Sequence, residues 1–232
     1  MAHLSTVRHE PIFDHTKHTD RVHIIGAGAT GSRVFAALIE LGVTNISVYD
    51  FDGVEAHNLA NQAYGFKDIG TSKVSALCNW YIAKTGTAPP PEMEFHGARV
   101  GVRFPAKPLD GFVFLLTDTV ESRKQIFDIY LHAEQCGQIK HVIETRMAAL
   151  HGTVMHFDPN DADQAQRWLD SLPNEETTEL SACGSPISVG TTASIIANLA
   201  VQQYMWLCEN PAGADSRISV QLRPLSIVTG RL

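Results

Sequence analysis

The chain has 232 residues, of which 44% are hydrophobic and 19% are charged, and its formal net charge at pH 7 is −7. A chain of this length has room for the core of one α/β domain but not of two ordinary ones. We therefore expect an N-terminal arm over residues 1–20 and a single domain over 21–232. The negative charge makes nucleic acid an unlikely partner.

No apolar run reaches the roughly 18 residues of a membrane span, and the polar, His-rich start is unlike a signal peptide. We therefore expect a cytoplasmic protein with no membrane partner. The irregular spacing of the early histidines favours a solvated or partly ordered arm over a metal site. The cysteines form no CxxC pair, so neither a zinc ribbon nor a disulfide framework is predicted from Cys78, Cys136, Cys183 and Cys208.

Residues 21–50 show the pattern of a strand, a glycine turn, a helix and a second strand. An apolar run covers 21–25, helical spacing covers 29–41, and a second apolar run covers 45–50. The two strands should be parallel and joined by a right-handed crossover.

The alternation of helices and strands continues beyond this unit. A helix is expected from Ser72 or Lys73 to about residue 84, strands near 92–100, 111–118 and 141–147, and a helix over 120–135. The later part reads as an extended segment at 152–159, helices over 164–172 and 187–208, and a closing pair of strands over 217–230. The fold class is α/β: a Rossmann-like, doubly wound, mostly parallel sheet with C-terminal antiparallel strands.

The glycine turn predicts a nucleotide site. Glycines at these spacings permit a tight turn, close approach of a phosphate and close packing of helix on sheet, and an acid about 20 residues later accepts hydrogen bonds from a ribose. The residues are Gly26, Gly28, Gly31 and Asp50. Alone, this pattern does not distinguish NAD from ATP.

The residues that follow favour ATP. A polar loop takes the place of a nicotinamide pocket, and it leads to Lys73 at a helix start, where a cation suits a polyphosphate. Asp118 at the end of a strand suits Mg²⁺ held jointly by one carboxylate and the substrate phosphates. The alternative for Asp118 is a helix N-cap. The polar loop contains Asp52, Asn58, Asn61 and Gln62.

These features together resemble the ThiF/MoeB/HesA family, the adenylyltransferases related to ubiquitin-activating enzymes. The resemblance covers about residues 20–208 and rests on six motifs in order: GAGATG, 50-DFD-52, 57-HNLANQ-62, 68-DIGTSK-73, 117-TDTVESR-123 and 182-ACGSP-186. Two family residues are replaced, an arginine by Asn61 and an asparagine by Thr119. The zinc CxxC motifs are missing, as in compact members of the family.

The resemblance implies an ATP- and Mg²⁺-dependent adenylyltransferase. Asp118 would hold Mg²⁺ and align a substrate carboxylate for attack on the α-phosphate. The substrate would be the C-terminus of a small ubiquitin-like or sulfur-carrier protein, and the enzyme a homodimer. The ATP site would consist of Gly26, Gly28, Gly31, Asp50, Asp52, Asn58, Gln62 and Lys73.

The loss of the arginine at Asn61 leaves the phosphate site short of one positive charge. Lys67, Arg123 and Arg146 are candidates to replace it, and Arg123 and Lys73 are expected to be catalytic. Arg8 either reaches a partner subunit's site or is an ordinary surface charge, the reading we favour.

Cys183 raises the question of covalent chemistry. In a polar loop before a helix it could attack the adenylate to form a thioester or acyl-disulfide, or it could be an inert cysteine at the edge of the core. Glu144 and Arg146 share one face of a strand, and mutual pairing is favoured over contact with substrate.

Other functions stay open at this point. A non-catalytic nucleotide-binding scaffold would explain Asn61 and Thr119, and an NAD(P)-dependent dehydrogenase would also use the glycine turn. Activation of a small acid or of a modified tRNA base is a further alternative.

Overall fold

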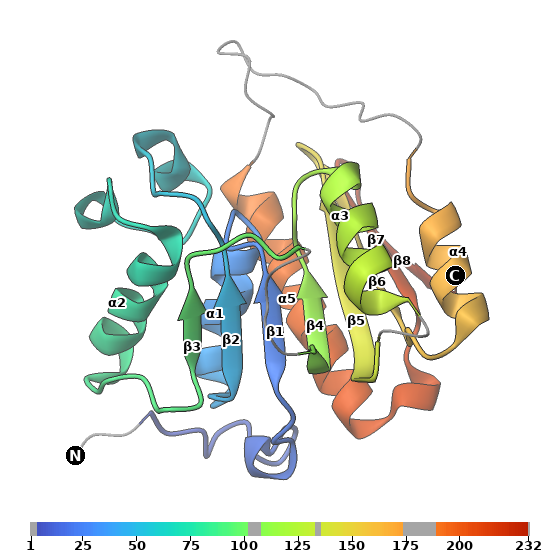
Figure 1. Cartoon of the computed structure of the whole chain (residues 1–232), viewed down its shortest axis with the longest axis horizontal. Helices are drawn as coiled ribbons and strands as arrows, with labels where there is room; N and C mark the ends of the chain where they lie inside the picture. The colour runs from blue at the N-terminus through green and yellow to red at the C-terminus, as the bar shows by residue number, and fades with distance from the viewer. Residues whose placement is uncertain (1–3, 102–107, 133–135, 174–188, 232) are drawn as a thin grey trace.

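One eight-stranded sheet runs through the molecule in the order β3-β2-β1-β4-β5-β6-β7-β8 (Figure 1). The computed structural model describes residues 4–101, 108–132, 136–173 and 189–231. Strands β1 to β5 pair in parallel, and β6, β7 and β8 are antiparallel. The strands are β1 (Val22–Ile25), β2 (Ile46–Tyr49), β3 (Glu94–His96), β4 (Asp110–Leu115), β5 (Gln138–Met147), β6 (His151–Phe157), β7 (Arg217–Leu222) and β8 (Leu225–Gly230). The predicted fold class is confirmed.

Helices cover both faces of the sheet (Figure 1). On one face lie α1 (Gly31–Glu40), α2 (Lys73–Thr85) and α5 (Gly190–Glu209), and on the other lie α3 (Val120–Ile126) and α4 (Ala162–Asp170). Short helical turns are η1 (His15–Lys17), η2 (Ala56–Ala60), η3 (Phe66–Asp68), η4 (Phe127–Leu131) and η5 (Pro211–Gly213).

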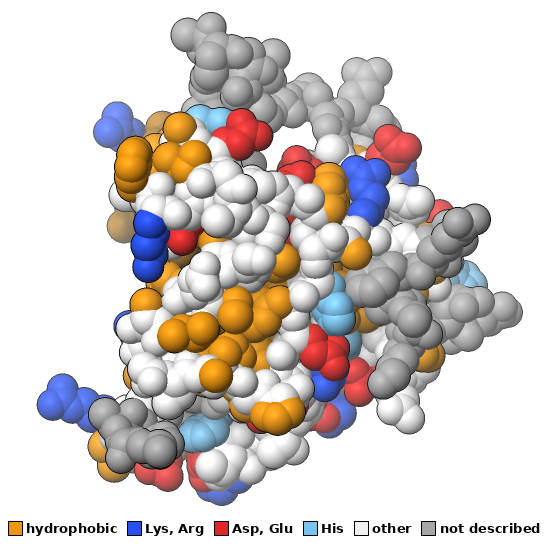
Figure 2. Space-filling model, turned by 60° about the vertical axis from the view of Figure 1, so that its left-hand side comes forward, with side chains coloured by type: hydrophobic (Ala, Val, Ile, Leu, Met, Phe, Trp, Pro, Cys, Tyr) orange, Lys and Arg blue, Asp and Glu red, His pale blue; other side chains and the backbone are white. Residues whose placement is uncertain are grey.

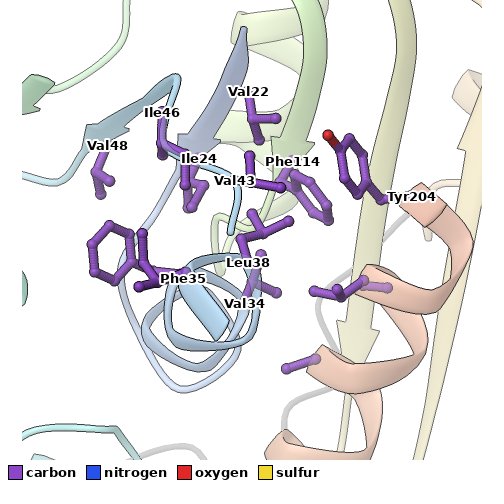
Figure 3. Close-up of a cluster of buried hydrophobic side chains, with 14 of the residues drawn as sticks. Val22, Ile24, Val34, Phe35, Leu38, Val43, Ile46, Val48, Phe114 and Tyr204 are labelled. Atoms are coloured by element: carbon purple, nitrogen blue, oxygen red, sulfur yellow. The ribbon is translucent and has the colours of Figure 1, made fainter. Parts of the chain in front are cut away.

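The first βαβ unit is held by apolar side chains that recur at helical spacing in α1. Val34, Phe35 and Leu38 are fully buried against the sheet. Figure 3 shows them facing side chains of β1, β2 and β4, with Tyr204 of α5 closing the cluster. Burial of such side chains is the main favourable term in folding. The unit is therefore a firm base for the turn between β1 and α1.

The end of β4 differs from the sequence prediction. The strand stops at Leu115, three residues before Asp118, and α3 begins at Val120 after an extended Thr119. The side chain of Thr119 accepts a hydrogen bond from the backbone N–H of Ser122. The N-cap of α3 is therefore Thr119, and the alternative that assigned this cap to Asp118 is wrong.

The N-terminal arm is packed more closely than expected. The side chain of Phe13 is fully buried, its ring lies 5.9 Å from that of Tyr204, and it stacks on His18 at 5.2 Å. The arm passes beneath the sheet in Figure 1. An apolar anchor therefore ties the arm to α5 at this residue, while most of its other described residues are exposed or half-buried.

The two edges of the sheet differ. At one edge, β3 has only three residues, and Glu94 and His96 are hydrogen-bonded to each other. Figure 2 shows the side of the molecule that carries this edge, with apolar and uncharged side chains in the centre and charged ones around them. At the other edge, β8 exposes Leu225, Ile227 and Val228. Among the described residues, no helix is long and apolar enough to cross a membrane.

Candidate functional site

Asp50 joins the end of β2 to the glycine turn. One carboxylate oxygen accepts a hydrogen bond from the backbone N–H of Ala27 at 2.6 Å, and the other accepts one from Asp52 at 2.8 Å. The side chain is only 7% exposed. Burial raises the pKa of Asp50, while the nearby charge of Lys73 and the two N–H groups act in the opposite direction. The carboxylate is thus fixed at the sheet edge where ligands bind in open α/β folds.

Lys73 brings two sequence motifs together. It is the first residue of α2, whose N-cap is Ser72. Its Nζ lies 2.9 Å from Oδ2 of Asp52 and 4.0 Å from Oδ1 of Asp50, and its backbone N–H donates to the Asp52 carbonyl at 2.9 Å. The side chain is 9% exposed. The structure therefore brings Asp50, Asp52 and Lys73 together, as their order in the sequence predicted.

The three glycines of the turn have different surroundings. Gly26 has φ +99°, and a Cβ there would lie 2.7 Å from the Leu116 carbonyl oxygen. A Cβ on Gly31 would lie 1.9 Å from the Gly26 carbonyl oxygen. No atom lies within 4 Å of the place that a Cβ on Gly28 would take. Two glycines therefore serve packing, and Gly28 leaves open space in which a ligand could approach the backbone.

Residues 56–64 lie beside the glycine turn. The hydroxyl of Tyr64 donates to the Ala27 carbonyl at 2.6 Å, and the N–H of Ala63 donates to Oγ of Ser32 at 3.0 Å. The buried side chain of Asn58 accepts a hydrogen bond from Glu55 and so shapes η2.

Two amide side chains in this segment have unused oxygens. In the described part of the chain, the buried oxygens Oδ1 of Asn61 and Oε1 of Gln62 have no hydrogen-bond partner. A buried polar atom without a hydrogen-bond partner costs free energy, so such atoms commonly pair with a ligand or a water molecule.

Asp118 lies on the exposed turn between β4 and α3. Within the described ranges, no hydrogen bond or ion pair to its carboxylate is present. Next to it, the buried hydroxyl of Thr117 also has no partner among the described residues. An exposed carboxylate that could meet a ligand therefore follows β4, beside a buried hydroxyl that lacks a partner among the described residues.

Arg123 is bonded to the backbone of this turn. It is 8% exposed, and its Nη2 donates to the carbonyls of Thr117 at 2.6 Å and Thr145 at 3.2 Å. Its Nε lies 3.2 Å from Oε1 of Glu144. These contacts tie together the ends of β4 and β5, so this arginine is well placed to hold the backbone before Asp118.

Glu144 is fully buried between two arginines. Nε of Arg146 lies 3.0 Å from Oε2 of Glu144, which confirms the favoured pairing. Arg146 also donates to the carbonyl and hydroxyl of Ser171 at the end of α4. Three residues were candidates to replace the family arginine at Asn61. Arg146 is held at the end of α4, Arg123 is buried and bonded to the Thr117 carbonyl, and Lys67 is exposed.

The remaining predicted residues divide into described and undescribed ones. Cys183 and the rest of its motif lie outside the described residues. Cys136 is buried, and burial raises the pKa of the partly buried Cys208 to about 12. Arg8 is exposed. Among the described residues, no group of three or more His, Cys, Asp or Glu side chains could hold a metal ion.

Sequence reasoning missed Tyr64, Ser32 and Arg33 at this site. Nε of Arg33 lies 3.4 Å from the Asn61 carbonyl, so its side chain reaches the segment beside the turn. For Arg33 a signal existed, because a cation in the first turn of a helix runs against the usual preference for acids there. For Tyr64 and Ser32 the spacing carries no such signal.

Comparison with known proteins supports the resemblance. The sequence model of the ThiF family matches residues 6–82, the part of the chain that holds the glycine turn, Asp50 and Lys73. The resemblance to the ThiF family is therefore confirmed over these residues. No curated protein matches the sequence of the chain.

Solved structures share the fold over nearly the whole chain. A structure of PaaA aligns with a TM-score of 0.65 and 18% identity, covering 93% of this chain and 64% of that one. A structure of MccB from E. coli with ATP aligns with a TM-score of 0.68 and 15% identity, covering 93% and 66%. The microcin C7 biosynthetic enzyme MccB with N-formylated MccA aligns with a TM-score of 0.67 and 14% identity, covering 95% of this chain and 66% of that one. The chain spans just under two thirds of the length of these proteins.

Proposed function

Since the chain is ThiF-like over residues 6–82 and has the adenylyltransferase-type fold of MccB and PaaA, we propose that it activates a carboxylate with Mg·ATP. The carboxylate would be the C-terminus of a small ubiquitin-like or sulfur-carrier protein. The observation that carries the proposal is the pairing of buried Asp50 and Lys73 beside the open backbone at Gly28. Asp50 as ribose acceptor, Lys73 as cation and the glycine turn as phosphate loop would then meet at one sheet edge.

The nucleotide would be held by groups that the fold already fixes. Asp50 would accept hydrogen bonds from the ribose hydroxyls, and the open backbone at Gly28 and the start of α1 would face the phosphates. Lys73 would exchange its ion pair with Asp52 for the triphosphate, beside Asn58 and Gln62. Structures of E. coli MccB contain ATP or AMPCPP, which supports this use of the fold.

Asp118 fits a magnesium ligand. Its carboxylate is exposed and no described side chain is paired with it, and Mg²⁺ commonly takes one or two carboxylates with the rest of its shell from phosphates and water. Bound there, Mg²⁺ would neutralise charge on the phosphates. Arg123 would act through the Thr117 carbonyl by keeping the Asp118 turn in place.

The reaction would join a carboxylate oxygen to the α-phosphorus and break the bond from that phosphorus to the bridging oxygen. An acyl-adenylate forms and pyrophosphate leaves, with Lys73 offsetting its charge. Structures of MccB, which shares this fold, contain MccA. This supports the proposal that the chain takes a second substrate beside the nucleotide. Transfer of the acyl group to the Cys183 thiol would release AMP.

A homodimer is part of the proposal. The free edge strand β8 carries three exposed apolar side chains, Leu225, Ile227 and Val228, and an exposed apolar edge of this kind favours pairing with another chain. Light scattering on the purified chain tests this arrangement. The substitution Val228→Lys, which alters the exposed edge strand, serves as the comparison.

Exchange of labelled pyrophosphate into ATP tests the activity. The assay contains Mg²⁺ and candidate carrier proteins that end in glycine. Asp118→Asn should reduce the exchange by about 100-fold or more, because the carboxylate that would hold Mg²⁺ beside the reacting phosphates is lost. The melting temperature should stay unchanged, since this side chain is exposed.

Glu121→Gln is the matched control, because it removes another exposed carboxylate from the first turn of α3. It should keep full exchange. Full exchange by Asp118→Asn would remove this residue from the mechanism. ATP binding without exchange, for every carrier tried, would favour the non-catalytic scaffold instead. Cys183→Ala should keep exchange but lose any thiol-sensitive conjugate.

A further inference from the structure

Arg33 occupies an unfavourable place for a cation. It is the third residue of α1, in the first turn, and no acidic residue accompanies it there. The N-terminal end of a helix carries partial positive charge from unpaired N–H groups, so it favours anions and disfavours cations. The stability of α1 therefore does not explain a positive charge at this position.

Nothing in the described part of the chain neutralises Arg33. Its hydrogen bond to the Asn61 carbonyl is long, at 3.4 Å, and it makes no ion pair. In contrast, Arg21, Arg123 and Arg146 each lie within 3.4 Å of a glutamate oxygen. The side chain of Arg33 is also partly buried, so water screens it less than it screens an exposed arginine.

The guanidinium lies where three segments meet. Besides Asn61, it approaches the start of α5, because a Cβ on Gly190 would lie 3.4 Å from Nη2 of Arg33. The buried oxygens of Asn61 and Gln62 that lack partners belong to the same loop. The structure thus places an uncompensated cation beside the glycine turn, against the segment that holds Asn61.

We propose that Arg33 binds the polyphosphate of the nucleotide, with its N–H groups donating to phosphate oxygens. A guanidinium matches phosphate geometry because it can donate two parallel hydrogen bonds. The bound anion would also supply the negative charge that the start of α1 favours. This inference rests on the proposed function for the identity of the anion, and it adds a contact from α1 to that site.

Calorimetry with inorganic tripolyphosphate and with adenosine tests the role of Arg33. Arg33→Gln should weaken tripolyphosphate binding by about 10-fold or more, since a charge-assisted pair is lost. Adenosine binding should stay the same. Arg33→Lys should recover part of the loss, because it restores the charge but not the paired geometry. The melting temperature of unliganded Arg33→Gln should equal or exceed that of the wild type.

Arg217→Gln is the matched control, because it removes an exposed arginine from the start of β7, on a strand remote from the glycine turn. It should bind tripolyphosphate as the wild type does. The inference is overturned if wild type binds no tripolyphosphate, or if Arg33→Gln binds it normally. Equal losses of melting temperature and adenosine binding would assign Arg33 a structural role instead. If binding depends on Arg33 but the wild type shows no pyrophosphate exchange, the proposed function fails and the anion site stands.

Discussion

At the scale of single residues, Asp50 and Asp52 differ in how much the fold depends on them. Asp50 accepts two backbone N–H groups, whereas Asp52 is half exposed and its side chain pairs with Lys73. Asp50→Asn should lower the free energy of unfolding by about 1–3 kcal/mol, because an amide oxygen satisfies one N–H and the amide NH₂ faces the other. Asp52→Asn should cost less than Asp50→Asn, because the Asp52 carboxylate is half exposed and Asp50 stays beside Lys73. Urea denaturation measures both values, and equal costs would contradict the assigned geometry.

The residues that sequence reasoning found and those it missed differ in a physical way. Asp50 and Lys73 end a strand and begin a helix, so their spacing in the sequence fixes where they lie. Arg33 and Tyr64 contribute through contacts between segments that only the folded chain brings together. The cationic side chain against Asn61 is that of Arg33 and not one of the predicted replacements, Lys67, Arg123 and Arg146, and the spacing could not show this.

At the scale of elements, the turn between β1 and α1 should respond differently to each glycine substitution. Gly26→Ala should cost about 1–3 kcal/mol, because an alanine is strained at a positive φ. Gly31→Ala should also destabilise, since its Cβ would overlap the Gly26 carbonyl. Gly28→Ala should fold with wild-type stability but bind AMPCPP about 10-fold more weakly, because its Cβ enters the open space. Urea denaturation and calorimetry measure the series, and full AMPCPP affinity in Gly28→Ala would refute phosphate contact there.

The types of the elements followed from periodicity, but several boundaries did not. The helix expected over 120–135 is α3 up to Ile126 followed by the single turn η4, and the strand expected to reach Asp118 ends at Leu115. The early end of the strand arises at Thr119, whose side chain caps α3 and leaves an extended turn before it. A threonine and an aspartate are both good caps, so the sequence did not decide between them.

At the scale of the whole molecule, the sheet order and the anchoring of the arm were beyond the sequence. Alternation of helices and strands predicted parallel strands, and a closing antiparallel pair was expected over 217–230. Phe13 lies in a mostly polar arm whose other large apolar residues, Leu4, Val7 and Ile12, are exposed, and its contact with Tyr204 of α5 joins residues far apart in the chain. Such long-range packing depends on the complete fold, which local patterns do not describe.

Buried histidines should make the stability of the whole molecule fall in acid. His156 lies on β6 with its Nδ1 accepting a hydrogen bond from Gln203, and burial lowers its pKa to about 4. The unfolded chain binds a proton near pH 6.5, whereas the folded chain stays neutral there, so stability is present above pH 6.5 and declines as the pH falls towards 4. Between pH 7.5 and 5, His156 alone should account for a loss of about 2 kcal/mol. Burial also lowers the pKa values of His23 and His141, which adds to the loss.

Urea denaturation at pH 7.5 and pH 5 measures this effect. His156→Asn keeps an acceptor for Gln203 but cannot titrate, so its free energy of unfolding should fall by about 2 kcal/mol less than that of the wild type. His151→Asn is the control, because His151 is exposed on the same strand, and it should show the wild-type fall. If His156→Asn loses as much stability as the wild type, this histidine is not kept neutral by burial. The acid response would then come from His23, His141 or the carboxylates.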